Sequence, residues 1–171
     1  LAKAKKLKCG NPMDPETDVG TVIHEGAAKS FEARVADAVK QGAKVLHGQP
    51  REGALFPVTV VDHIPYTCEL VHEETFGPVA AITRFSTEDE AIRIANDTVY
   101  GLAAYFMTTD LARTWRVGEA LEYGILGINT GLISTEVAPF GGVKESGIGR
   151  EGSSFGVDDW VELKYWSIGV G

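Results

Sequence analysis

The hydrophobic pattern between residues 79 and 129 constrains the fold more than any other feature of this sequence. Strand-like and helix-like segments alternate there in the order strand 79–85, helix to about Asn96, strand 102–107, helix after Asp110 and strand 125–129. Each connection is long enough for successive strands to pair in parallel. The pattern therefore predicts an α/β fold with a doubly wound, mostly parallel sheet flanked by helices.

Start and stop signals support this order. Residues 86–90 read Ser-Thr-Glu-Asp-Glu, which offers two overlapping capping boxes for the helix that follows. Earlier in the chain, apolar residues at helical spacing predict a helix over 25–41, and Gly42 is suited to end it. Residues 55–61 are β-rich, although Pro57 indicates an edge strand or an irregular start.

The end of the chain predicts one more strand. Over 160–168 the apolar residues Val161, Leu163 and Tyr165 alternate with charged ones, which is typical of a half-buried strand. A terminal strand of this kind joins the edge of its own sheet or that of a partner.

Composition excludes several classes of protein. The chain has 171 residues, and 16 Lys and Arg against 24 Asp and Glu give a net charge of −8, which disfavours nucleic-acid binding. No apolar run reaches the roughly 18 residues that a membrane span needs. The two cysteines and four histidines have the spacing of neither a disulfide framework nor a metal site. We therefore expect a cytoplasmic protein, or a mitochondrial matrix protein in a eukaryote.

Seven glycines lie between Gly131 and Gly156, after the last strand of the alternating region. Ligands of doubly wound sheets bind beyond the carboxyl ends of strands, so this segment is the first place to look for a site. The GxGxxG pattern at 147–152 follows a loop instead of a strand, so we interpret it as turn chemistry and not as a dinucleotide fingerprint.

Residues 73–78, Glu-Glu-Thr-Phe-Gly-Pro, allow two interpretations. The first is a solvated acidic turn in which Phe76 fills the core. In the second, one carboxylate accepts hydrogen bonds from the vicinal hydroxyls of a ligand while Phe76 offers a flat face to a ring.

Several motifs, taken in order, resemble the C-terminal half of the aldehyde dehydrogenase superfamily. They are residues 73–79 (EETFGPV), 91–101 (AIRIANDTVYG), Asn129 and 139–147 (PFGGVKESG). Within that superfamily, residues 131–142 (GLISTEVAPFGG) and 149–153 (GREGS) are most similar to the succinate-semialdehyde dehydrogenases. The resemblance covers essentially the whole chain.

The resemblance implies a role for six residues. Glu74 would bind the hydroxyls of the nicotinamide ribose of NAD or NADP, and Phe76 would pack beside the nicotinamide. Ser134 would donate a hydrogen bond to the distal carboxylate of succinate semialdehyde, and Phe140 would form a wall of the substrate tunnel. Arg150 and Glu162 match a pair in a structural network near the subunit interface.

The resemblance also implies what this chain lacks. The nucleophilic cysteine, the glutamate base, the oxyanion-hole asparagine, the carboxylate-binding arginine and the N-terminal cofactor domain would all precede Leu1, and neither Cys9 nor Cys68 matches the nucleophile's motif. A start at Leu1 instead of Met is what a fragment would show. Residues 1–157 would be part of the catalytic domain and residues 158–171 an oligomerisation strand. We expect the chain alone to contain no catalytic residue and to be inactive.

Two alternatives to a succinate-semialdehyde dehydrogenase stay open at this point. One is a related semialdehyde dehydrogenase, such as one acting on glutarate semialdehyde. The other is a non-catalytic module whose terminal strand mediates assembly. A succinate-semialdehyde dehydrogenase and a related semialdehyde dehydrogenase would both act on a small-molecule semialdehyde and form a homo-oligomer.

Overall fold

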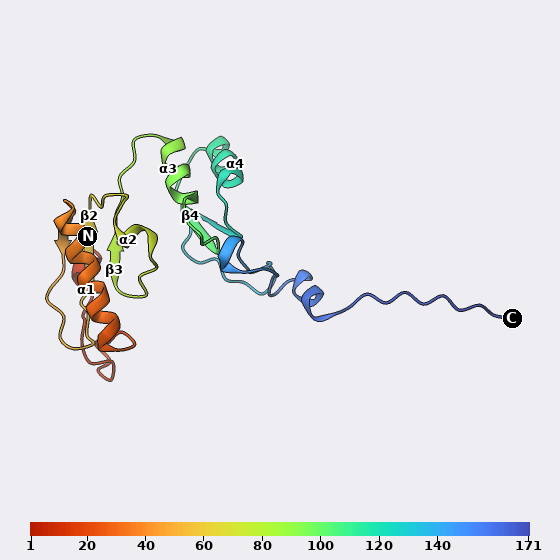
Figure 1. Cartoon of the computed structure of the whole chain (residues 1–171), viewed down its shortest axis with the longest axis horizontal. Helices are drawn as coiled ribbons and strands as arrows, with labels where there is room; N and C mark the ends of the chain where they lie inside the picture. The colour runs from red at the N-terminus through yellow and green to blue at the C-terminus, as the bar shows by residue number, and fades with distance from the viewer. The chain divides into compact units, whose positions relative to one another are not determined.

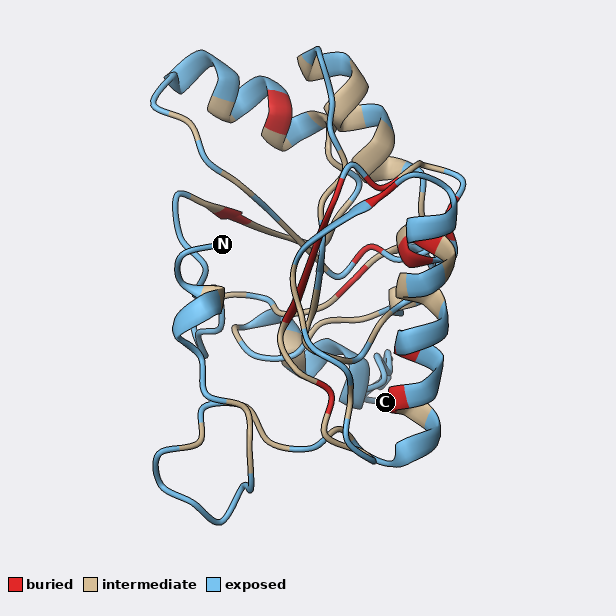
Figure 2. Cartoon of the chain, turned by 90° about the vertical axis from the view of Figure 1, so that its left-hand side faces the viewer, coloured by how far each residue is buried: buried red, intermediate tan, exposed pale blue.

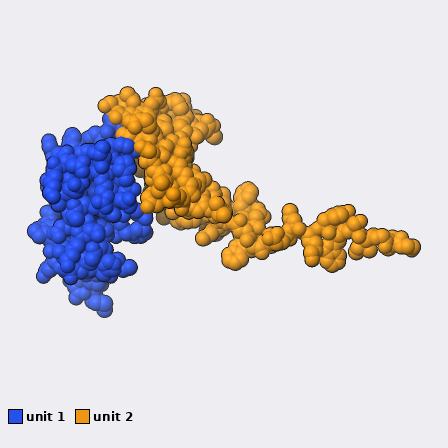
Figure 3. Space-filling model, in the orientation of Figure 1, with its two compact units in different colours: residues 1–85 blue, residues 86–171 orange.

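The computed structural model describes residues 1–171 (Figure 1). The chain forms two compact units, Leu1–Phe85 and Ser86–Gly171 (Figure 3). Three short 3-10 helices accompany the longer elements: η1 (Ala4–Lys6), η2 (Lys144–Ser146) and η3 (Phe155–Trp160). None of the helices is both long and apolar enough to span a membrane.

The first unit is built on a sheet of three strands. Its order is β1 (Lys44–His47), β2 (Thr59–Asp62) and β3 (Val79–Ala81), with β1 antiparallel and β3 parallel to β2. All four residues of β2 are buried, as expected for a central strand with a neighbour on each edge (Figure 2).

Helices α1 (Glu25–Lys40) and α2 (Glu69–His72) pack against each other in this unit. Two clusters form its core. The first is Ala38, Ala43, Val61, Ile64, Cys68 and Leu70; the second is Ala28, Phe31 and Phe56. The rings of Phe31 and Phe56 meet edge to face, with centroids 5.8 Å apart. Burial raises the pKa of the Cys68 thiol.

The predicted helix over 25–41 is confirmed as α1. His24 Nδ1 accepts a hydrogen bond from the Ala27 amide at 3.0 Å and so caps the first turn. Gly42 follows the helix with a φ of +107°, a conformation that favours glycine.

The second unit contains α3 (Glu88–Asn96), β4 (Ala103–Phe106), α4 (Leu111–Ala120) and β5 (Ile125–Ile128), with β4 parallel to β5. The predicted order of helices and strands is therefore confirmed. Thr87 is the cap of α3, because its Oγ1 accepts from the Glu90 amide at 3.1 Å, while the Glu90 carboxylate accepts from the amide of Ser86 at 2.7 Å. Asp110 caps α4 as predicted.

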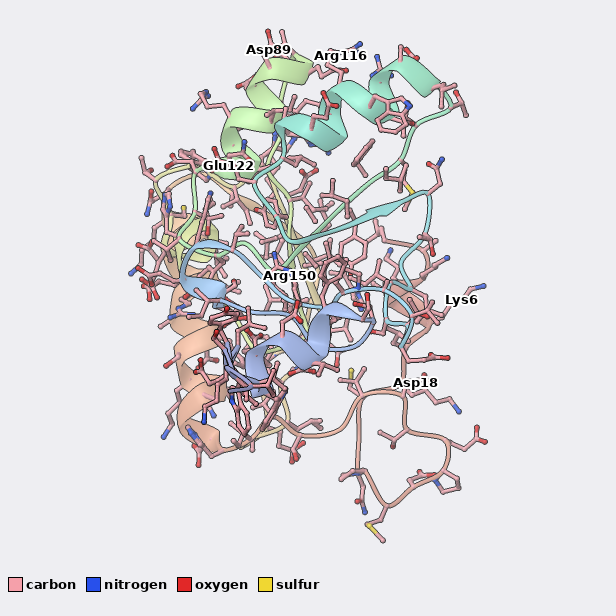
Figure 4. All side chains as sticks on the ribbon, turned by 90° about the vertical axis from the view of Figure 1, so that its right-hand side faces the viewer. Lys6, Asp18, Asp89, Arg116, Glu122 and Arg150 are labelled. Carbon is pink, nitrogen blue, oxygen red and sulfur yellow. The ribbon has the colours of Figure 1, made fainter.

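Helices α3 and α4 lie side by side (Figures 1 and 4), and ion pairs link them. Glu88 accepts hydrogen bonds from Arg113 Nε at 2.7 Å and from Arg116 Nε at 2.6 Å. These two guanidinium groups lower the pKa of Glu88 to about 2. Val117 is the single buried hydrophobic side chain of this unit, so ion pairs and backbone hydrogen bonds hold much of it together.

The strands and helices of the structure differ from the predicted ones in three respects. Strand β3 pairs with β2, whereas β4 pairs with β5, so the chain contains two sheets and not one doubly wound sheet. Strand β2 begins only at Thr59: Pro57 has no amide hydrogen to donate to a ladder, and the Val58 amide donates to Cys9 Sγ instead of to a strand. Strand β1 and helix α2 were not predicted.

The predicted strand over 160–168 is not formed in this chain. Trp160 ends η3, and residues 161–171 have no regular secondary structure and are exposed. A strand is stable only when its amides and carbonyls find a neighbouring ladder, and this segment has none within the chain. Its role in oligomerisation, and the domain boundary expected after residue 157, stay predictions.

Asp62 joins the end of β2 to the segment that follows β3. Its carboxylate accepts hydrogen bonds from Arg84 Nε at 2.9 Å and from the His63 amide at 2.8 Å. The Arg84 guanidinium lowers the pKa of Asp62 to about 2. Because this value lies below that of an unfolded aspartate, the pair stabilises the fold at neutral pH and is lost as the pH falls toward 2.

We predict that Asp62→Asn lowers the free energy of unfolding at neutral pH and makes its decline with acid shallower, since one depressed carboxylate has been removed. Urea unfolding between about pH 2 and pH 7 measures both effects. Glu119→Gln is the control, because Glu119 is exposed and has no ion pair. An unchanged pH profile in Asp62→Asn would contradict the assignment.

Candidate functional site

Residues 73–78 form a turn between α2 and β3, which we call the acidic turn. At its start the Glu73 amide donates to the Glu69 carbonyl at 2.8 Å. At its end the Pro78 carbonyl accepts from the amide of Thr59 on β2, also at 2.8 Å. The turn is therefore attached at both ends to elements of the core.

Helix α1 holds the middle of the acidic turn. Arg34 Nη1 donates to the Glu74 carbonyl at 2.9 Å, and Arg34 Nε donates to Glu69 Oε1 at the same distance. The buried ring of Phe31 lies against Gly77, where an added Cβ would collide with it. The middle of the turn is thus held by the hydrogen bond from Arg34 to the Glu74 carbonyl and by the close packing of Phe31 against Gly77.

The two predicted cofactor residues lie on this turn with their side chains exposed. The carboxylate of Glu74 makes no hydrogen bond or ion pair within the chain, and Phe76 is 82% exposed. The interpretation of Phe76 as a core residue is therefore wrong. A free carboxylate and a free aromatic face on a fixed backbone suit a ligand that carries hydroxyls and a ring.

The glycine-rich segment of the second unit, residues 130–157, is held by the elements before it. Lys144 Nζ donates to the carbonyl of Asn96 at the end of α3 at 2.7 Å and forms an ion pair with Glu122. The Gly101 amide donates to Ser146 Oγ at 2.9 Å. The segment is therefore a loop that is fixed by hydrogen bonds and an ion pair to the elements before it.

The structure brings the two predicted substrate residues together. Ser134 and Phe140 line one hollow of about 460 Å³, together with Thr135, Glu136, Glu151 and Gly152. Ser134 is exposed and Phe140 is half-buried. The backbone of Phe140 is paired with that of Glu151 through hydrogen bonds of 2.8 and 2.7 Å. The chain thus presents a hydroxyl and a fixed aromatic wall in the same hollow.

Arg150, labelled in Figure 4, lines a second hollow of about 390 Å³. Phe140 also lines this hollow. Arg150 Nη1 donates to the carbonyls of Gly142 at 2.9 Å and of Gly149 at 2.6 Å, and the Arg150 amide donates to Asp159. The predicted pair between Arg150 and Glu162 is not formed in this chain. Glu162 follows η3 in the exposed segment and has no partner, because nothing in the chain packs there.

Sequence reasoning missed Arg34. Phe31 and Arg34 are three residues apart and so share one face of α1, a signal that the helical pattern contains. The sequence does not show that this face lies beside Glu74, because Glu74 is 40 residues further along the chain.

The family of this chain follows from comparison with known proteins. The model of the aldehyde dehydrogenase family matches residues 1–166. The chain belongs to the aldehyde dehydrogenase family. The resemblance inferred from the motifs is confirmed at this level, and the fold agrees: succinate-semialdehyde dehydrogenase from Burkholderia pseudomallei superposes with a TM-score of 0.94 and 49% identity, over 99% of this chain and 36% of that structure.

Two curated members of the aldehyde dehydrogenase family are equally similar to this chain. Escherichia coli succinate-semialdehyde dehydrogenase [NADP(+)] is 50% identical over 96% of this chain. Pseudomonas putida glutarate-semialdehyde dehydrogenase is 50% identical over 99% of it. In both cases the chain spans 35% of the relative's length.

We predict that Gly77→Ala destabilises the fold by about 1–3 kcal/mol, the usual effect of overpacking a close contact. The added methyl meets the Phe31 ring, which is itself held against Phe56. Thermal unfolding compared with Gly131→Ala provides the measurement, because a Cβ at Gly131 meets no atom within 4 Å. Equal melting temperatures for the two variants would show that the turn has room to move.

Proposed function

We propose that this chain forms part of the catalytic domain of an NAD(P)-dependent semialdehyde dehydrogenase that oxidises succinate semialdehyde to succinate in the cytoplasm. The observation that carries the proposal is the hollow in which Ser134 and Phe140 lie together. Both residues stand in the sequence motifs that resemble the aldehyde dehydrogenases, and in the structure they line the same hollow. The proposal is further supported by relatives that are named for semialdehydes.

On the substrate side, Ser134 has a hydroxyl without a partner in the chain. It donates a hydrogen bond to the distal carboxylate of the substrate, an interaction worth about 1.5–3 kcal/mol when one partner is charged. Phe140 covers the aliphatic carbons and limits access of water.

The charges around this hollow support a site completed from outside the chain. Glu136 and Glu151 line it, and no lysine or arginine does. A carboxylate bound between two glutamates requires a cation nearby, since like charges repel each other at short range. We propose that this cation belongs to another segment of the full-length protein.

On the cofactor side, the residues of the acidic turn fit a nicotinamide nucleotide. When bound, such a cofactor accepts a hydride from the substrate carbon. The Glu74 carboxylate accepts hydrogen bonds from ribose hydroxyls, and the exposed face of Phe76 packs beside the nicotinamide ring. Neither side chain has to leave another partner in order to do so.

The cysteines of the chain do not suit the nucleophilic step. Cys68 is fully buried, and burial raises the pKa of its thiol. Cys9 Sγ accepts a weak hydrogen bond from the Val58 amide at 3.4 Å, and no hydrogen bond links it to a histidine or carboxylate base. We propose that the nucleophile and its base lie elsewhere in the full-length protein.

Residues 161–171 support a homo-oligomer. Leu163, Tyr165 and Trp166 are each at least 71% exposed, and the backbone of this segment pairs with no strand. We propose that the segment completes its hydrogen bonds as a strand against a second copy of the protein.

Glutarate semialdehyde is the second candidate substrate, favoured by the equal similarity to a relative named for it. The two substrates differ by one methylene, which a hydrophobic wall such as Phe140 discriminates by only about 10- to 200-fold. Values of kcat/KM for both semialdehydes, measured on the full-length protein, decide between them.

We predict that Ser134→Ala in the full-length protein raises KM for succinate semialdehyde about 10-fold or more, since it removes a hydrogen bond to a charged group. Butanal, which has four carbons and no carboxylate, is the control substrate and should be little affected. Ser30→Ala, at an exposed serine of α1, is the control variant. Equal effects on both aldehydes would contradict the carboxylate role.

We also predict that the isolated 171-residue chain forms no NADH or NADPH from succinate semialdehyde, because it lacks the nucleophile that the reaction needs. Absorbance at the reduced-nicotinamide band, with the full-length protein as the positive control, tests this. Turnover by the isolated chain would place the nucleophile within it.

A further inference from the structure

Helix α1 presents two neighbouring side chains to the acidic turn. Phe31 contacts Gly77, and Arg34 reaches the backbone at Glu74. The side chain of Arg34 is only 17% exposed, and two of its three guanidinium nitrogens donate hydrogen bonds. Its Nε donates to Glu69 Oε1 and its Nη1 to the Glu74 carbonyl, each at 2.9 Å.

The hydrogen bond from Arg34 is the one contact that holds Glu74. The Glu74 side chain has no partner, and its backbone makes no other hydrogen bond. The neighbouring Thr75 adds only a long contact, at 3.5 Å from Arg34 Nη1 to Oγ1. The direction in which the Glu74 carboxylate extends therefore depends on the peptide group that Arg34 fixes.

We infer that Arg34 is a positioning residue for cofactor binding: by holding the Glu74 carbonyl, it orients the Glu74 carboxylate toward the ribose hydroxyls. This inference rests on the function proposed above for Glu74. Lysine cannot replace arginine here, since one ammonium group cannot serve two acceptors with the fixed fork of a guanidinium group.

A merely structural role is the competing explanation, because the ion pair of Arg34 with Glu69 also joins α1 to α2. Arg51 supplies a matched control for it. Arg51 is 18% exposed, pairs with Glu32 and Glu25 of the same helix, and donates to the Gly53 carbonyl at 3.1 Å. No hydrogen bond or ion pair links Arg51 to the acidic turn. Arg51→Gln therefore measures the effect of losing an arginine–glutamate network without any effect on the turn.

The experiment is a double-mutant cycle in the full-length protein, with Arg34→Gln, Glu74→Gln and the double variant, and with Arg34→Lys and Arg51→Gln beside them. The readouts are the dissociation constant of NADPH, followed by its fluorescence, the single-turnover rate of hydride transfer and the melting temperature. Misplacement of a positioning group lowers a rate by about 10- to 100-fold.

We expect Arg34→Gln to slow hydride transfer about 10-fold or more, Arg34→Lys to recover little of this, and Arg51→Gln to leave the rate unchanged at a similar melting temperature. Because Arg34 acts through Glu74, the double variant should be no slower than Glu74→Gln.

Three results would overturn the inference, and they can be distinguished from one another. If Glu74→Gln slows hydride transfer but Arg34→Gln behaves like Arg51→Gln, then Arg34 is only structural. If the effects of Arg34→Gln and Glu74→Gln on the rate simply multiply, Arg34 does not act through Glu74. In both cases the proposed function stands. If Glu74→Gln itself leaves both cofactor binding and hydride transfer unchanged, the proposed role of Glu74 fails, and the positioning role of Arg34 fails with it.

Discussion

Strand β2 forms backbone hydrogen bonds along both edges, and its four residues are buried. Because β3 pairs with β2, and the Thr59 amide of β2 binds the Pro78 carbonyl, the end of the acidic turn is fixed to the most buried element of the first unit. The bidentate contact between Asp62 and Arg84 secures the opposite end of the β2–β3 pair. The position of the candidate cofactor residues thus depends on β2, although neither Glu74 nor Phe76 is hydrogen-bonded to it.

Both candidate sites combine a fixed backbone with free side chains. In the first unit, Arg34 and Phe31 hold the turn while Glu74 and Phe76 extend into solvent. In the second, pairing with Glu151 holds Phe140 while the Ser134 hydroxyl stays free. This division lowers the entropy lost on binding, because the ligand has only exposed side chains to order.

Local signals predicted the helices well and the sheets less well. Helix α1 ends before Gly42, and α3 and α4 begin directly after their caps Thr87 and Asp110, because caps act within four residues of their own sequence. Pairing between strands is not local. The prediction joined β3 to β4 through sequence order, whereas β3 pairs with β2, and the alternating residues after Trp160 have no neighbour with which to form a ladder.

By itself, the sequence identified Glu74, Phe76, Ser134 and Phe140 as candidate site residues, because each of them stands in a short contiguous motif that can be recognised without a structure. Only the tertiary structure decided that Ser134 and Phe140 share a hollow, that Arg150 binds carbonyls and not Glu162, and that Arg34 holds Glu74. These contacts join residues far apart in the chain or depend on which neighbours a side chain meets. Burial and distance arise only when the helices and strands pack together.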